Sequence, residues 1–61
     1  MTKAKEILLD TVIAVLGHEH KKTILFAEIL ETASDEPDAI AKLKELTEQI
    51  IEQEHKERED N

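Results

Sequence analysis

The stretch ASDEPD, residues 33–38, is the one cluster of turn-forming residues in this 61-residue chain. It contains the only proline, which the first turn of a helix tolerates but a helix interior does not. Ser34 or Asp35 can cap the N-terminus of a following helix, and the acidic side chains suit the positive end of its dipole. The stretch therefore predicts a boundary between two helices.

The segments on either side of this boundary differ in composition. Residues 1–33 hold 17 of the 24 apolar side chains, with four basic and five acidic residues. Residues 34–61 hold the other seven, with four basic and ten acidic residues, so the charges of −1 and −6 add up to −7. A chain of this length forms one small domain, and its acidic balance argues against nucleic acid, whose phosphates require a basic surface.

The composition also excludes several kinds of site. With one glycine and no cysteine, the chain has no glycine-rich phosphate loop, no disulfide and no thiol nucleophile. Its apolar runs are far shorter than a membrane span, and its N-terminal residues do not resemble a signal peptide, so we expect a cytoplasmic protein. We expect no cofactor, no metal site and no enzymatic activity.

Residues 36–56 have the apolar spacing of an amphipathic helix with one buried face. Leu43, Leu46 and Ile50 recur at steps of three or four residues, and Glu, Lys and Gln fill most of the other positions. From Glu52 onward the chain is mostly charged, so we expect a tail that frays.

Residues 3–33 carry apolar side chains on two faces of a predicted helix. A lone strand has no partner in so short a chain, so we predict helix over about 3–33. Gly17 would weaken that helix by about 1 kcal/mol and could split it. Residues 18–23 contain no proline and no turn dipeptide, which favours one continuous helix. The main apolar stripe of this helix consists of Leu9, Ile13, Leu16, His20, Thr23, Ile24, Ala27 and Leu30. A second, weaker stripe on the opposite side consists of Ile7, Ala14, Leu25 and Ile29.

Two helices cannot cover each other's apolar surfaces when one of them is apolar on two sides. A single core in 61 residues also barely outweighs chain entropy. We therefore predict an all-α fold, a two-helix antiparallel hairpin with its turn at about 34–36, that dimerises into a four-helix bundle of either orientation. The predicted dimer core consists of Leu9, Ile13, Leu16, His20, Ala27, Leu30, Leu43, Leu46 and Ile50.

The histidines at 18 and 20 are the main candidates for chemistry. They are two residues apart, whereas paired metal ligands on a helix are three or four apart, so zinc is not expected. On a continuous helix His18 faces solvent, where its neutral imidazole would be a nucleophile that Glu19 orients, with Lys21 offsetting the charge of a phosphoryl group. The apolar and basic residues around His18 predict a docking surface for another protein, which consists of Ala14, His18, Lys22, Leu25 and Ile29.

The string His18-Glu19-x-Lys21-x-x-Ile24, inside a helix that precedes an acidic turn and a second amphipathic helix, resembles the dimerisation and histidine-phosphotransfer hairpin of sensor kinases. The resemblance covers roughly residues 12–54. It implies a phosphoacceptor at His18, followed by the family's acidic residue at Glu19, its basic residue at Lys21 and a buried aliphatic residue at Ile24. Because the chain has no ATP-binding domain, the resemblance implies a phosphoryl relay and not autophosphorylation.

Two alternatives stay open. A plain helical interaction module, or a purely structural dimer, would also have a histidine on its surface and a hydrogen-bonded His20 in its core. In the phosphotransfer interpretation, the presence of His20 leaves open which of the two imidazoles would accept phosphate. The length and two-helix plan are also similar to the small plasmid copy-control proteins that bind paired RNA loops as four-helix dimers. Only Lys3, Lys5, Lys21 and Lys22 would supply the basic patch that such RNA binding needs. We expect a homodimer that binds another protein, with nucleic acid less favoured and no membrane partner.

Overall fold

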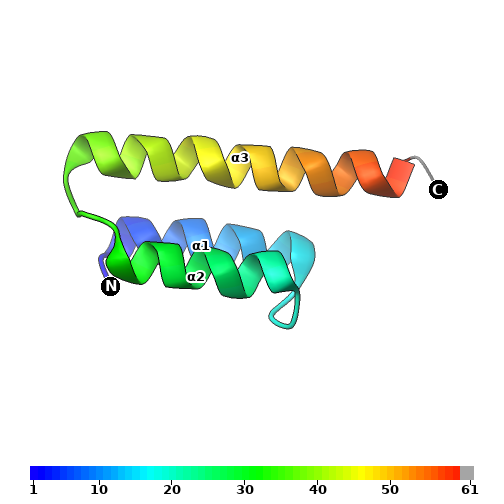
Figure 1. Cartoon of the computed structure of the whole chain (residues 1–61), viewed down its shortest axis with the longest axis horizontal. Coiled ribbons are helices and arrows are strands. Elements are labelled where there is room, and N and C mark those ends of the chain that lie inside the picture. Colours follow the sequence, from blue (N-terminus) through cyan, green and yellow to red (C-terminus); the bar gives the residue numbers. More distant parts are fainter. Residues whose placement is uncertain (60–61) are drawn as a thin grey trace.

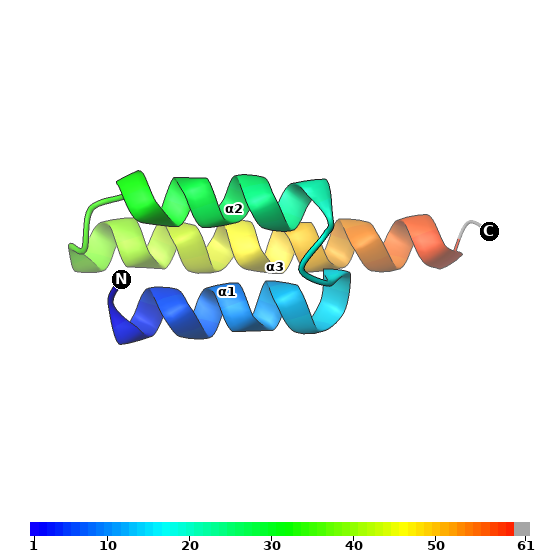
Figure 2. The same cartoon turned by 90° about the horizontal axis from the view of Figure 1, so that it is seen from below.

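The computed structural model describes residues 1–59, and all regular structure within them is α-helical, as predicted. Helix α1 spans Lys3–Leu16, α2 spans Lys21–Thr32 and α3 spans Pro37–Glu59. Helices α1 and α2 lie antiparallel side by side, and α3 covers one face of that pair (Figures 1 and 2). The N-terminus therefore lies at the same end of the molecule as the connection between α2 and α3 (Figure 1).

The predicted continuous helix over 3–33 is wrong, because the chain reverses at residues 17–20. Helix α1 ends where the Gly17 N–H donates to the Ile13 carbonyl at 2.8 Å, and Gly17 itself takes φ +95° and ψ 161°. The reversal brings residues of α2 back alongside α1. In a continuous helix, Val12 and Phe26 would be about 21 Å apart along the axis and could not share a core.

The core is formed within the single chain. Its buried apolar side chains come from all three helices: Val12, Phe26, Leu30 and Leu43. The partly buried apolar side chains that pack against them are Leu8, Leu9, Leu16, Ala33, Ile40, Leu46 and Ile50. Six of the residues predicted for a dimer core thus lie in or against the core of one chain, namely Leu9, Leu16, Leu30, Leu43, Leu46 and Ile50, while Ile13 and Ala27 are half-buried.

Helix α3 begins after the predicted turn and runs further than predicted. The Glu36 N–H donates to Ser34 Oγ at 3.2 Å, and the Ile40 N–H donates to the Glu36 carbonyl at 3.0 Å, so the helix starts at Pro37. Its charged end is helical through Glu59, beyond the predicted start of a tail at residue 52, and residues 60–61 of that tail lie outside the described part. Within residues 1–59, no helix has both the length and the apolar character to cross a membrane.

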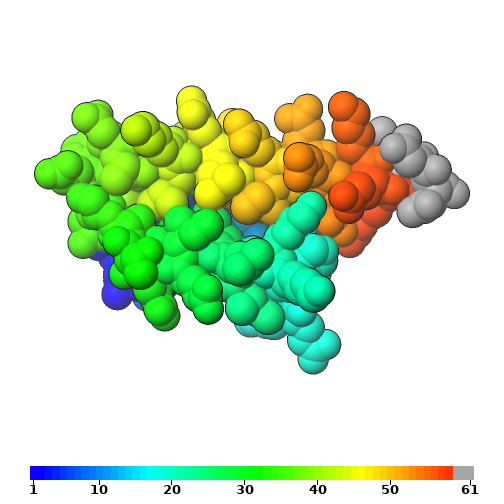
Figure 3. All heavy atoms as spheres, viewed as in Figure 1, coloured from blue at the N-terminus to red at the C-terminus, as the bar shows by residue number. Residues whose placement is uncertain are grey.

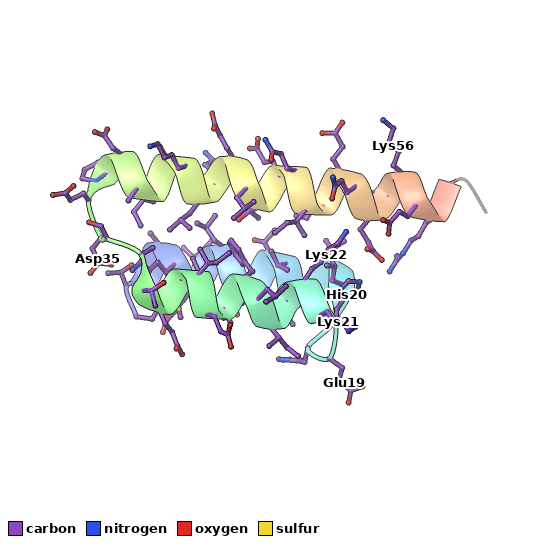
Figure 4. All side chains as sticks on the ribbon, in the orientation of Figure 1. Glu19, His20, Lys21, Lys22, Asp35 and Lys56 are labelled. Atoms are coloured by element: carbon purple, nitrogen blue, oxygen red, sulfur yellow. The ribbon has the colours of Figure 1, made fainter. Side chains whose placement is uncertain are left out.

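Lys5 fastens α1 to the α2–α3 connection. Its residue is only 4% exposed, although lysine is rarely buried without a partner. The Nζ atom donates to the Ala33 carbonyl at 2.6 Å and lies 2.8 Å from Asp35 Oδ1, so the buried ammonium group has both a hydrogen bond and an ion pair. The hydrogen bond satisfies the Ala33 carbonyl at the C-terminal end of α2. The ion pair holds α1 against the α2–α3 connection, where Asp35 lies (Figure 4).

Candidate functional site

The turn at residues 17–20 lies at the end of the α1–α2 pair opposite the α2–α3 connection, and it projects away from α3, which extends past it (Figures 1 and 3). His18 and Glu19 are exposed there, outside any helix, which corrects the expectation that both lie on a helix face. The His18 imidazole makes no hydrogen bond or ion pair with the other side chains of residues 1–59. It is therefore open to a partner or a reagent from solution.

His20 caps helix α2, and the prediction that it lines a helical seam is wrong. Its Nδ1 atom accepts a hydrogen bond from the Lys22 N–H at 3.0 Å, so in the neutral ring the proton lies on Nε2. Nε2 lies 3.5 Å from Glu54 Oε2 on α3. The Nδ1 atom of His20 is thus engaged within the fold, whereas neither nitrogen of His18 is.

Replacing His20 with alanine should lower the free energy of unfolding by about 1 kcal/mol, because the first turn of α2 loses its side-chain acceptor. His20→Asn should recover most of this loss, since asparagine is among the best N-cap residues. Urea denaturation followed by circular dichroism measures both variants. His18→Ala, two residues earlier and exposed, is the control and should stay within about 0.5 kcal/mol of the parent. An equal loss in the asparagine variant would contradict the capping role.

Two further contacts join the end of α1 and the start of α2 to α3, and an ion pair within α3 accompanies them. Glu54 Oε1 lies 3.7 Å from the Arg58 Nε, and the Arg58 Nη2 donates to the Val15 carbonyl at 3.4 Å. Lys22 Nζ lies 3.8 Å from Glu57 Oε1. The Arg58 and Glu57 side chains are mostly exposed, so each of these pairs contributes little on its own. Together they define the position of the turn relative to α3.

The four lysines that could have formed a basic patch are not brought together. Lys5 is buried against Asp35, and Lys22 pairs with Glu57 at the other end of the molecule. Lys3 begins α1 and Lys21 begins α2, and the antiparallel arrangement of those helices separates them by the length of the bundle (Figures 1 and 2). The arrangement provides no concentrated positive surface for RNA phosphates.

Helix α2 carries most of the exposed large apolar side chains of the described residues. Of the five such residues in the part of the chain that the structure describes, three belong to α2: Ile24 at 52%, Leu25 at 57% and Ile29 at 42%. The other two, Met1 and Ile7, belong to the N-terminal segment and α1. The exposure of Ile24 differs from the buried aliphatic residue that the sensor-kinase resemblance implies. We call the exposed face of this helix the outer face of α2, and it consists of Lys21, Ile24, Leu25, Glu28, Ile29 and Thr32.

The predicted partner surface is therefore only partly assembled. Leu25 and Ile29 lie together on the outer face of α2, with Lys22 half-buried beside it. Ala14 is exposed but lies on α1, and His18 lies in the turn, so neither shares a helix with Leu25. A continuous helix over residues 3–33 would place all of them on one stripe, and the reversal at Gly17 separates them.

The described residues offer surfaces for binding and two exposed imidazoles, His18 in the turn and His55 on α3. No group of three or more His, Cys, Asp or Glu side chains within residues 1–59 is arranged to hold a metal ion. Comparisons with models of protein families, with curated proteins and with solved structures found no match to this chain. The arguments for function therefore come from the outer face of α2 and from the turn at residues 17–20.

Proposed function

We propose that this protein is a small regulatory module that works by binding protein, beginning with a second copy of itself, and not by catalysis. The observation that carries the proposal is the outer face of α2, where a helix of 12 residues exposes three large aliphatic side chains. Burying apolar surface is favourable by about 25 cal/mol per Å², so a docked partner would be stabilised there.

The small core supports the same proposal. Only four apolar residues in the described part of the chain are buried, which leaves a domain of this size close to the limit of stability. An additional apolar interface would add to that stability by mass action. Because residues 1–59 of each chain form three helices, the proposed dimer joins two three-helix subunits and is not a four-helix bundle of two hairpins.

His18 as a phosphoacceptor is the second candidate function. The accessibility of its ring supports it, as does Lys21 at the adjacent start of α2, where a cation and the positive end of the helix dipole would favour a phosphoryl group. The Nδ1 atom of His20 is occupied by the Lys22 N–H, which favours His18 over His20 as the acceptor. In the reaction a ring nitrogen would attack phosphorus, the bond from phosphorus to the donor's leaving group would break, and the leaving group would depart with a proton.

Native mass spectrometry before and after treatment with phosphoramidate tests both candidates. We expect a species of twice the 7.0 kDa chain mass, and an acid-labile phosphoryl group that is added as ammonia leaves the donor. His18→Gln should lose the label and keep the dimer, whereas His20→Asn, which keeps a helix cap, should retain both. A monomer at every concentration tested would contradict the module. A label that persists in His18→Gln would contradict only the phosphoacceptor.

A further inference from the structure

We propose that the outer face of α2 binds the same face of a second copy, with the two helices antiparallel and the two-fold axis between Ile24 and Leu25. This inference rests on the proposed function, and it adds the surface, the orientation and the residue pairs of the dimer. The outer face extends over the length of α2, because its residues recur at helical spacings of three and four.

The charges on this face determine the orientation. Lys21 and Glu28 are both exposed and are seven residues apart, which places them two helical turns apart on one face. An antiparallel pair centred between residues 24 and 25 places Lys21 of each copy opposite Glu28 of the other. A parallel pair in register would place lysine against lysine and glutamate against glutamate. The antiparallel pair therefore gains two ion pairs where the parallel pair has two repulsions.

The apolar side chains fill the space between these ion pairs. Ile24 and Leu25 lie within one residue of the proposed axis, so each meets its counterparts from the second copy. Both are more than half exposed in the single chain and would lose most of that exposure on pairing. Ile29 lies one residue beyond Glu28 and would contact the start of the second copy's α2. An apolar centre with charged flanks is the usual composition of a specific protein interface.

A second copy fits this face better than an unlike partner for two reasons. The pattern of lysine, two aliphatic residues and glutamate is complementary to itself under a two-fold rotation, which is the condition for an isologous interface. Helix α2 is also electrically neutral, with two lysines and two glutamates, although the whole chain carries −7. Helix α3 has seven acidic and four basic residues, so a dimer through α2 avoids pairing the acidic helices.

Charge reversal tests the pairing directly, with the dissociation constant of the dimer measured by analytical ultracentrifugation. Lys21→Glu makes both flanks acidic and Glu28→Lys makes both flanks basic, so each variant alone should dimerise roughly tenfold or more weakly than the parent. An equimolar mixture of the two should form a heterodimer. The chain that carries both substitutions should dimerise about as tightly as the parent. Lys44→Glu and Glu45→Lys, at exposed positions of α3, control for net charge and should leave the constant unchanged.

Disulfide formation tests the position of the axis, because the parent chain has no cysteine. Leu25→Cys should give a covalent dimer on mild oxidation, since Cα atoms beside the axis come within the roughly 7 Å that a disulfide allows. Ile7→Cys, exposed on α1, should cross-link much more slowly. A stable dimer that responds neither to charge reversal nor to Leu25→Cys oxidation would overturn the α2 pairing and leave the homodimeric module standing. A monomeric parent would overturn both.

Discussion

Phe26→Ala is expected to lower the free energy of unfolding by about 3–5 kcal/mol, which removes most of the stability of a domain this small. The Phe26 residue is 1% exposed and is the largest of the fully buried side chains. It comes from α2 and packs in one core with Val12 of α1 and Leu43 of α3. Truncation to alanine would leave a cavity where the three helices meet. Urea denaturation followed by far-ultraviolet circular dichroism should show a much lower midpoint, or a chain already partly unfolded without urea.

Ile7→Ala is the control for Phe26→Ala. Ile7 is a large aliphatic residue on α1, but it is 55% exposed and lies outside both the core and the outer face of α2. Its truncation should change the free energy of unfolding by no more than about 0.5 kcal/mol. Similar losses for the two variants would contradict the burial of Phe26 between the helices.

Gly17→Ala is expected to destabilise the protein by about 1–3 kcal/mol, because Gly17 adopts a backbone conformation that is essentially restricted to glycine. The penalty would come from the backbone alone, since an added Cβ meets no atom within 4 Å. A continuous helix through residue 17 predicts the opposite sign, because alanine stabilises a helix interior by about 1 kcal/mol relative to glycine. Urea denaturation of this one variant therefore distinguishes the reversal at residues 17–20 from an unbroken helix.

A chemically synthesised chain with D-alanine at position 17 provides the matched control. A D-residue favours positive φ, so it should adopt the Gly17 conformation without strain and restrict the unfolded chain, which stabilises the fold by up to about 1 kcal/mol. The two alanine enantiomers add the same methyl group and differ only in backbone preference. If L-alanine stabilises the protein and D-alanine destabilises it, the helix is continuous through residue 17.

The sequence was sufficient to predict the features that depend on local chemistry. The proline and the acidic residues at 33–38 predicted the end of one helix and the start of α3, and the helical spacing of Leu43, Leu46 and Ile50 predicted its inner face. The outward position of Leu25 and Ile29 also agrees with their predicted place opposite the core stripe. These predictions needed only turn propensity and a period of 3.6 residues.

The candidate site was predicted less well than the helices. The sequence singled out His18 and His20, and the structure makes the first accessible and the second a helix cap. Ile24 was expected to be buried, and its exposure next to Leu25 is what gives the outer face of α2 its apolar centre. The relevant signal was present in the sequence: residues 21, 24, 25 and 28 have the spacing of one helix face. That spacing becomes interpretable once α2 is known to be a separate helix.

The reversal at Gly17 and the burial of Lys5 depend on contacts between distant residues, and for that reason local patterns did not reveal them. The local preference against glycine in a helix is only about 1 kcal/mol, whereas burying Phe26 and Leu30 against α1 is worth about 1.5–3 kcal/mol for each side chain. The free energy of this burial is gained only if the chain folds back. Likewise, the ammonium group of Lys5 can be buried because Ala33 and Asp35, 28 and 30 residues away in the sequence, meet it in the folded chain. Composition and periodicity therefore specified the helices, and the free energy of packing them together specified where the first apolar segment breaks.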